Sequence, residues 1–107
     1  MLQLVEEWIK ENIKVHLTRG NTVFLPKWIR MNNDIIPGHE AIISTHLGAI
    51  YIKRKLTESF ENQIIISSNG ALYIPAEIRR KVKIGYGTTF EVYTNHQKTL
   101  QLVPIKK

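Results

Sequence analysis

The sequence IIISSNGALYIPAEIRRKVKIG at residues 64–85 carries four structural signals in succession. It begins with a run of isoleucines, passes through a Ser-Asn-Gly turn into a second short apolar run, and then reaches Pro75 and a basic segment. β-branched residues favour strands, Asn-Gly favours a tight turn, and proline suits the first turn of a helix. The order therefore predicts a strand, a turn, a second strand and a short helix over residues 76–83.

The same order of signals occurs earlier in the chain, which predicts an internal tandem repeat. A shift of 49 positions places Pro26, Ile29, Arg30, Ile35, Gly38 and Thr45 on Pro75, Ile78, Arg79, Ile84, Gly87 and Thr94. The first repeat then predicts strands at 15–18, 22–25, 40–45 and 49–54, and the second predicts strands at 63–68, 71–74, 88–94 and 98–103. A unit of about 40 residues is too small to bury a sufficient core alone, so we expect the two repeats to pair.

The predicted fold class is mainly β with short helices, in four segments. We expect residues 1–14 to form an amphipathic helix, because Leu2, Val5, either Trp8 or Ile9, and Ile13 follow helical spacing. Residues 15–55 form the first repeat, 56–62 a linker, and 63–107 the second repeat. The two repeats pair as one unit, either within one chain or between two chains.

Composition narrows the class of protein. The 107 residues allow one domain, and 15 Lys and Arg against 9 Asp and Glu give a net charge of +6. An excess of positive charge favours an anionic partner such as nucleic acid, although a basic protein with no such partner fits equally well. The absence of cysteine excludes disulfides and thiolate metal sites. With acidic residues near the N-terminus and no long apolar run, we expect a soluble cytoplasmic protein that does not enter membranes.

The motif around Ile74 and Pro75 resembles a known family. An apolar strand ending in Ile-Pro, a helix carrying Ile78 and Arg79, a Gly turn at Gly87 and a following hairpin resemble the AbrB/MazE/SpoVT swapped-hairpin DNA-binding family, here as a tandem repeat in one chain. The resemblance implies an AbrB-like β-barrel made of two interleaved copies, acting in transcription regulation or as the DNA-binding part of an antitoxin. One departure is that Thr22 and Ala71 stand where such proteins often carry an arginine that contacts DNA.

A helical wheel of residues 76–83 separates a core face from a basic face. Ile78 and Val82 fall together and face the core, while Arg79, Arg80 and Lys83 project outward. Glu77 and Lys81 stand four residues apart and can form an ion pair. The predicted DNA-binding residues are Arg79, Arg80, Lys83, Lys81, Arg30, Lys27 and Arg19. The first repeat is less basic on its helix, so we expect asymmetric binding of double-stranded DNA, with the second repeat contributing more.

Other functions remain open at this point. The chain can instead be a protein-interaction module, either antitoxin-like and bound to a toxin, or paired with itself or with another AbrB-like regulator. Catalysis is not expected, because His16, His39, His46 and His96 show no spacing typical of metal ligands or of a catalytic site. We therefore expect no enzyme activity, no cofactor and no metal.

Overall fold

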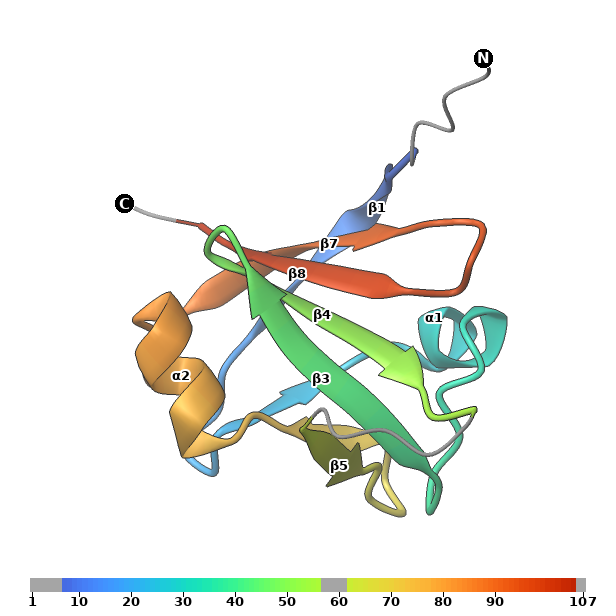
Figure 1. The fold of residues 1–107 in the computed structure, drawn as a ribbon, viewed down its shortest axis with the longest axis horizontal. Helices are drawn as coiled ribbons and strands as arrows, with labels where there is room; N and C mark the ends of the chain where they lie inside the picture. Colours follow the sequence, from blue (N-terminus) through green and yellow to red (C-terminus); the bar gives the residue numbers. More distant parts are fainter. Residues whose placement is uncertain (1–6, 57–61, 106–107) are drawn as a thin grey trace.

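The computed structural model describes residues 7–56 and 62–105 of the chain (Figure 1). The elements in chain order are β1 (Ile9–His16), β2 (Thr22–Phe24), α1 (Lys27–Asn32), β3 (Glu40–His46), β4 (Ala49–Arg54), β5 (Gln63–Ile65), β6 (Ala71–Tyr73), α2 (Ala76–Val82), β7 (Thr89–Thr94) and β8 (Leu100–Pro104). The prediction of a mainly β protein with short helices is thus confirmed. No helix among these residues is long and apolar enough to cross a lipid bilayer.

The strands form two antiparallel sheets. One has six strands in the order β1-β7-β8-β4-β3-β5, and the other has two, β2 and β6. Strands from the two halves of the chain pair with one another: β1 pairs with β7, and β2 pairs with β6. In Figure 1, α2 and α1 lie at opposite sides of the molecule, and α2 packs beside β3 and β4. Each half of the sequence therefore completes a sheet that contains strands of the other half.

The strand registers in the two halves correspond. His16 is opposite Thr89 in the ladder between β1 and β7, and Ile65 is opposite Glu40 in the ladder between β5 and β3. Ile65 lies 49 positions after His16, and Thr89 lies 49 positions after Glu40. The ladder between β5 and β3 therefore has the same register as the ladder between β1 and β7 when residues are matched by the shift of 49.

Alternating apolar residues build one core between the two sheets. On β4 and β8, Ile50, Ile52, Leu100 and Leu102 are fully buried, whereas the residues between them face outward. This period of two is the pattern expected of strands with one buried face. On α2 the buried residues are Ile78 and Val82, as the helical wheel predicts. The core therefore uses residues that the sequence pattern identifies.

The prediction of an N-terminal helix is wrong over residues 9–14, because these residues belong to β1. Ile13 and Val15 turn toward the core and Lys14 between them is exposed, so the apolar residues also fit a period of two. A helix of about 12 residues is marginal alone, whereas a strand here gains a ladder with β7. The earlier part of the expected helix and most of the expected linker lie outside the described residues.

The turns before β2 and β6 each contain a residue with a positive φ, but the residue type differs between them. Gly70 has a φ of 82°, as expected of the Asn-Gly turn. In the first half the corresponding positive φ of 62° belongs to Asn21, the residue after Gly20. Asparagine tolerates this left-handed conformation better than most residues. The turn is therefore retained without a glycine at the strained position.

The assignment of β1 predicts unequal effects of two isoleucines that a helix would place on one face. Ile13 packs against the core, while Ile9 is 50% exposed. Ile13→Ala should lower the free energy of unfolding by about 1 to 2 kcal/mol, and Ile9→Ala by less than about 0.5 kcal/mol. Urea unfolding of both variants measures the difference. Equal losses would argue against the strand.

Candidate nucleic-acid interface

Helix α2 presents a basic surface because of how it begins and ends. Pro75 precedes it in an extended conformation, and Lys83 ends it in the left-handed region with a φ of 56°. Glu77 lies in the first turn and the arginines and Lys81 lie in the last, which matches the helix dipole. The local sequence thus favours a short helix with its cations gathered toward one end.

Three cations of this region are exposed. They are Arg80, Lys81 and Lys83. Lys81 forms an ion pair with Glu77 at 3.4 Å, as the spacing predicts. Arg80 and Lys83 have no ion-pair partner among residues 7–56 and 62–105. Two unpaired positive charges therefore stand at the end of α2, free to contact an anion.

Arg79 lies differently from its neighbour Arg80. It is half-buried, and its Nε donates a hydrogen bond to the backbone oxygen of Ile74 at 3.0 Å. This bond ties α2 to the end of β6. At least one donor of Arg79 is therefore used within the chain, which makes it a poorer candidate for DNA contact than Arg80.

Arg30 makes the corresponding bond in the first half and also contacts the second. Its Nε donates to the backbone oxygen of Leu25 at 3.1 Å. Its guanidinium lies so close to Gly70 that a Cβ added there would be 2.5 Å from the arginine Cζ. The side chain therefore packs on the turn before β6. Of the predicted DNA-binding residues, Arg30 has the clearest structural role.

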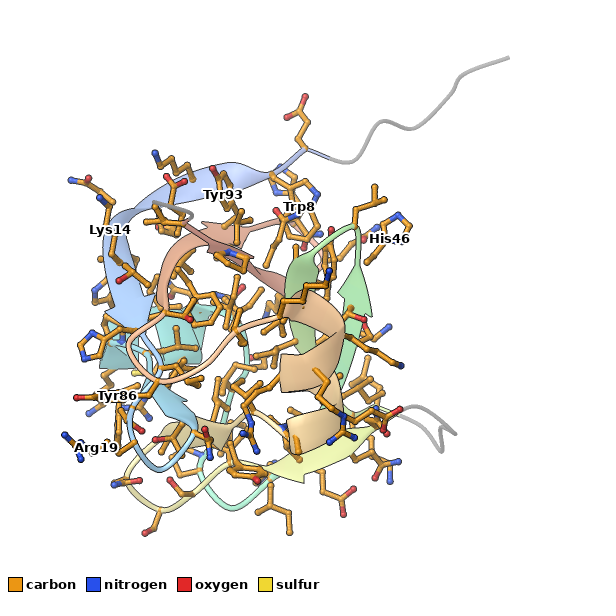
Figure 2. All side chains as sticks on the ribbon, turned by 90° about the vertical axis from the view of Figure 1, so that its left-hand side faces the viewer. Trp8, Lys14, Arg19, His46, Tyr86 and Tyr93 are labelled. Atoms are coloured by element: carbon orange, nitrogen blue, oxygen red, sulfur yellow. The ribbon has the colours of Figure 1, made fainter. Side chains whose placement is uncertain are left out.

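The turn between β1 and β2 brings another cation beside the loop that follows α2. Arg19 is exposed, and its guanidinium carbon lies 5.0 Å from the centre of the Tyr86 ring. The two loops are joined by backbone bonds from the N–H of Leu17 to Thr88 at 2.8 Å and from the N–H of Gly87 to Leu17 at 2.9 Å. Figure 2 looks onto the side that carries α2, where Arg19 and Tyr86 are labelled.

Tyr86 was not predicted from the sequence, although a signal existed. It stands between Gly85 and Gly87 in a turn and is 66% exposed. A large aromatic residue in such a place has no packing partner in its own element, which makes it a candidate for contact with a residue or ligand elsewhere. Here it supports Arg19.

The side that carries α1 is chemically different. Trp28 and Met31 are 49% and 65% exposed, at the positions that correspond to Glu77 and Arg80 on α2. Lys27 is also exposed and begins the helix. Apolar side chains therefore replace charged ones on the outer surface of α1.

Asp34 forms ion pairs with two cations near α1. Asp34 follows α1 at the position that Lys83 holds after α2. The backbone φ is positive at both residues, 57° at Asp34 and 56° at Lys83. The Asp34 carboxylate accepts a hydrogen bond from Lys98 at 3.0 Å and lies 3.6 Å from Arg54. The hydrogen bond and charge of Lys98, with the charge of Arg54, hold the pKa of Asp34 below its usual value. The single carboxylate of Asp34 therefore offsets part of the positive charge of Arg54 and Lys98.

The structure divides the predicted site residues into two groups. Arg19, Arg80, Lys81 and Lys83 belong to the side of α2, with Arg79 anchored beneath them, whereas Lys27 and Arg30 belong to α1. No group of acidic and histidine side chains in the described ranges could hold a metal ion.

Comparison of the chain with protein-family models, with curated proteins and with solved structures finds no match. The geometry of the surface therefore carries the functional argument.

The packing of Arg30 on Gly70 predicts a coupled effect on stability. Gly70→Ala should cost the strain of a left-handed alanine, about 1 to 2 kcal/mol, plus about 1 kcal/mol for displacing Arg30 from its hydrogen bond. Gly48→Ala is the control, because Gly48 has a φ of 81° but no atom within 4 Å of an added Cβ.

Denaturant unfolding of both glycine variants, alone and combined with Arg30→Ala, tests this coupling. The additional loss at Gly70 should disappear when Arg30 is absent. An unchanged loss would mean that the arginine does not restrain the turn.

The ion pairs of Asp34 predict a pH-dependent contribution to stability. Because its pKa is lower in the folded chain, the carboxylate stabilises the fold above the ordinary value of 3.8, and this contribution is lost as the pH falls through the folded pKa. Asp34→Asn keeps a side chain that tolerates a positive φ. The wild type should be the more stable at pH 7, and the two unfolding curves should converge in acid. A constant difference between pH 7 and pH 2 would contradict the assignment.

Proposed function

We propose that this chain is a sequence-preferring DNA-binding transcription regulator of the AbrB-like type, acting in the cytoplasm. The observation that supports it most is the cluster of unpaired cations at the end of α2, extended by Arg19 on Tyr86. The planar fork of arginine donates two hydrogen bonds at once and suits both phosphates and guanine edges. A surface of this kind binds an extended anion better than a small one.

The pairing of strands between the two halves supports the accompanying proposal about architecture. In a swapped-hairpin body built from two tandem repeats, each repeat contributes strands to the sheet of the other. The pairs β1 with β7, β3 with β5 and β2 with β6 have that arrangement. We infer that the two repeats form an internal pseudo-dimer within one chain, with α1 and α2 as corresponding helices.

The difference between the two helices supports asymmetric contact with DNA. The α2 side keeps Arg80 and Lys83 unpaired, whereas Asp34 holds Arg54 and Lys98 in ion pairs on the α1 side. A duplex bound across the pseudo-twofold axis would then contact the α2 side more strongly. Arg30, held between Leu25 and Gly70, supports the fold more than the binding.

Retention of double-stranded DNA tests the proposal with two matched variants. Arg80→Gln/Lys83→Asn removes the unpaired cations, and Arg54→Gln/Lys98→Asn removes the same charge from paired ones. Lys83 and Lys98 both have a positive φ, 56° and 61°, so both asparagines meet the same backbone demand. A random-sequence duplex pool serves as the probe, with salt varied.

The α2 variant should bind about 10-fold to 100-fold more weakly, with a log-log salt slope smaller by about 1.8 for two lost phosphate contacts. The control variant should change affinity less than about threefold. Equal losses, or no retention of DNA by the wild type at low salt, would refute the proposal. Selection of bound duplexes then tests sequence preference, and the solution mass tests the internal pseudo-dimer.

A protein-interaction module is the second candidate, and the exposed Trp28 and Met31 on α1 favour it. A second copy, another AbrB-like regulator or a toxin would cover these side chains on binding. Such an interaction buries apolar surface and depends weakly on salt, whereas DNA binding depends on it strongly. The two functions are therefore separated by the salt series alone.

A further inference from the structure

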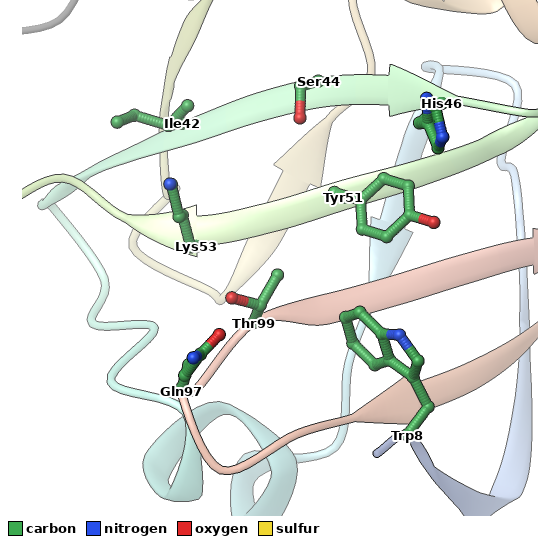
Figure 3. Close-up of a pocket in the computed structure, with 8 residues that line it drawn as sticks. All are labelled: Trp8, Ile42, Ser44, His46, Tyr51, Lys53, Gln97 and Thr99. Atoms are coloured by element: carbon green, nitrogen blue, oxygen red, sulfur yellow. The ribbon is translucent and has the colours of Figure 1, made fainter. Parts of the chain in front are cut away.

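A groove of about 380 Å³ lies on the face of the six-stranded sheet that points away from the core. Its lining comes from β3, β4, the segment before β1 and the turn before β8 (Figure 3). The lining residues are Trp8, Ile42, Ser44, His46, Tyr51, Lys53, Gln97 and Thr99. None of these residues belongs to the basic surface of α2.

Two aromatic side chains form one end of the groove. The rings of Trp8 and Tyr51 are 5.8 Å apart at their centres and inclined by 56°. The hydroxyl of Tyr51 accepts a hydrogen bond from the side-chain amide of Gln101 at 2.9 Å, which fixes the ring position. A fixed aromatic wall on an open sheet is a surface on which a flat base can stack.

The other end of the groove holds a cation. Lys53 lies two residues after Tyr51 on β4, about 7 Å along the strand, and its side chain is exposed. It has no ion-pair partner among the residues that the structure describes. Figure 3 shows the hydroxyls of Ser44 and Thr99 between this lysine and the aromatic end.

The fold itself does not require this set of side chains. The hairpin of β7 and β8 corresponds to that of β3 and β4. A shift of 50 positions places Gln101 on Tyr51 and Val103 on Lys53. Both hairpins nevertheless form the same sheet in the same register. Ser44, Tyr51 and Lys53 therefore occur together only on the hairpin of β3 and β4, and the turn before β8 adds Thr99. Ligand binding explains this set better than packing.

We propose that this groove binds a nucleoside phosphate, with the base against Trp8 and Tyr51 and the phosphate at Lys53. The hydroxyls of Ser44 and Thr99 then face the sugar. The size falls within the usual range of small-molecule sites. A free mononucleotide and an unpaired nucleotide of a single strand share this chemistry. The proposal stands apart from the duplex-binding surface of α2, since the two use different residues.

Tryptophan fluorescence tests the proposal directly. The chain has 2 tryptophans, so in a Trp28→Phe background Trp8 is the single reporter. The titrants are AMP, GMP, CMP and dTMP, with adenosine, ribose 5-phosphate and a short single-stranded oligonucleotide as comparisons. Mononucleotides should change the Trp8 emission saturably, and ribose 5-phosphate should not, because it has no base to stack.

Two further variants in this background identify the residues. Lys53→Met should weaken mononucleotide binding about tenfold and leave adenosine binding unchanged, because only the phosphate contact is lost. Lys14→Met removes the same charge from an exposed residue outside the groove and should change affinity less than twofold. Tyr51→Leu should weaken mononucleotides and adenosine alike.

The comparison of titrants assigns the source of the ligand. Saturation by mononucleotides assigns the groove to free nucleotides, and saturation by the oligonucleotide alone assigns it to single strands; either result supports the proposal. No saturable change with any titrant up to 10 mM would overturn it. Equal losses from Lys53→Met and Lys14→Met would also overturn it, since the attraction would then be that of net charge.

Discussion

The pairing of strands between the two halves of the chain is the constraint on which the rest of the structure depends. β1 reaches its partner β7 across most of the sequence, and β5 reaches back to β3. Neither half has a complete sheet without the other, so neither can bury its apolar residues alone. The loops that carry Arg19 and Tyr86 meet only because this pairing joins Leu17 to the backbone beside Gly87. The contact between Arg19 and Tyr86 therefore depends on strands and loops of both halves.

Once the two halves are locked together, single residues can make them chemically unequal. Asp34 and Lys83 hold the same left-handed position after their helices. Asp34 forms ion pairs with two cations, whereas Lys83 adds a positive charge with no ion-pair partner among the described residues. Trp28 and Met31 likewise replace charged residues on the outer side of α1. Because none of these side chains belongs to the core, such changes cost little stability. One fold can thus carry a cationic side, an apolar side and an outer groove.

Much of the fold was accessible from local pattern. The turn at Gly70, helix α2 after Pro75, and the buried Ile78 and Val82 all follow from residue type and spacing. The pair of Glu77 with Lys81 also followed, because it lies within one helix. The expected helix over residues 9–14 was wrong, since spacing at Ile9 and Ile13 fits a strand equally well, and the partner strand that decides between them lies some 80 residues away.

The candidate sites were less accessible than the fold. Arg79 and Arg80 look equivalent as neighbours in the sequence. In the structure, the Nε of Arg79 donates a hydrogen bond to the backbone oxygen of Ile74, whereas Arg80 is exposed and has no ion-pair partner among the described residues. In the sequence, Lys53 is one of 15 Lys and Arg residues, and nothing there indicates that it lines the same groove as Trp8. Which cations are paired, which are buried and which stand beside an aromatic ring depends on contacts between distant segments.

The order of residues alone accounts for most of the secondary structure, the buried faces and the excess of positive charge. Backbone preference and hydrophobic period act over only a few positions, so they can be read locally. Tertiary contacts alone decide the pairing of strands between the two halves, the ion pair of Asp34 with Lys98, the packing of Arg30 on Gly70 and the groove beside Trp8. Each joins residues far apart in the chain, and short-range preference carries no information about which distant surfaces will meet.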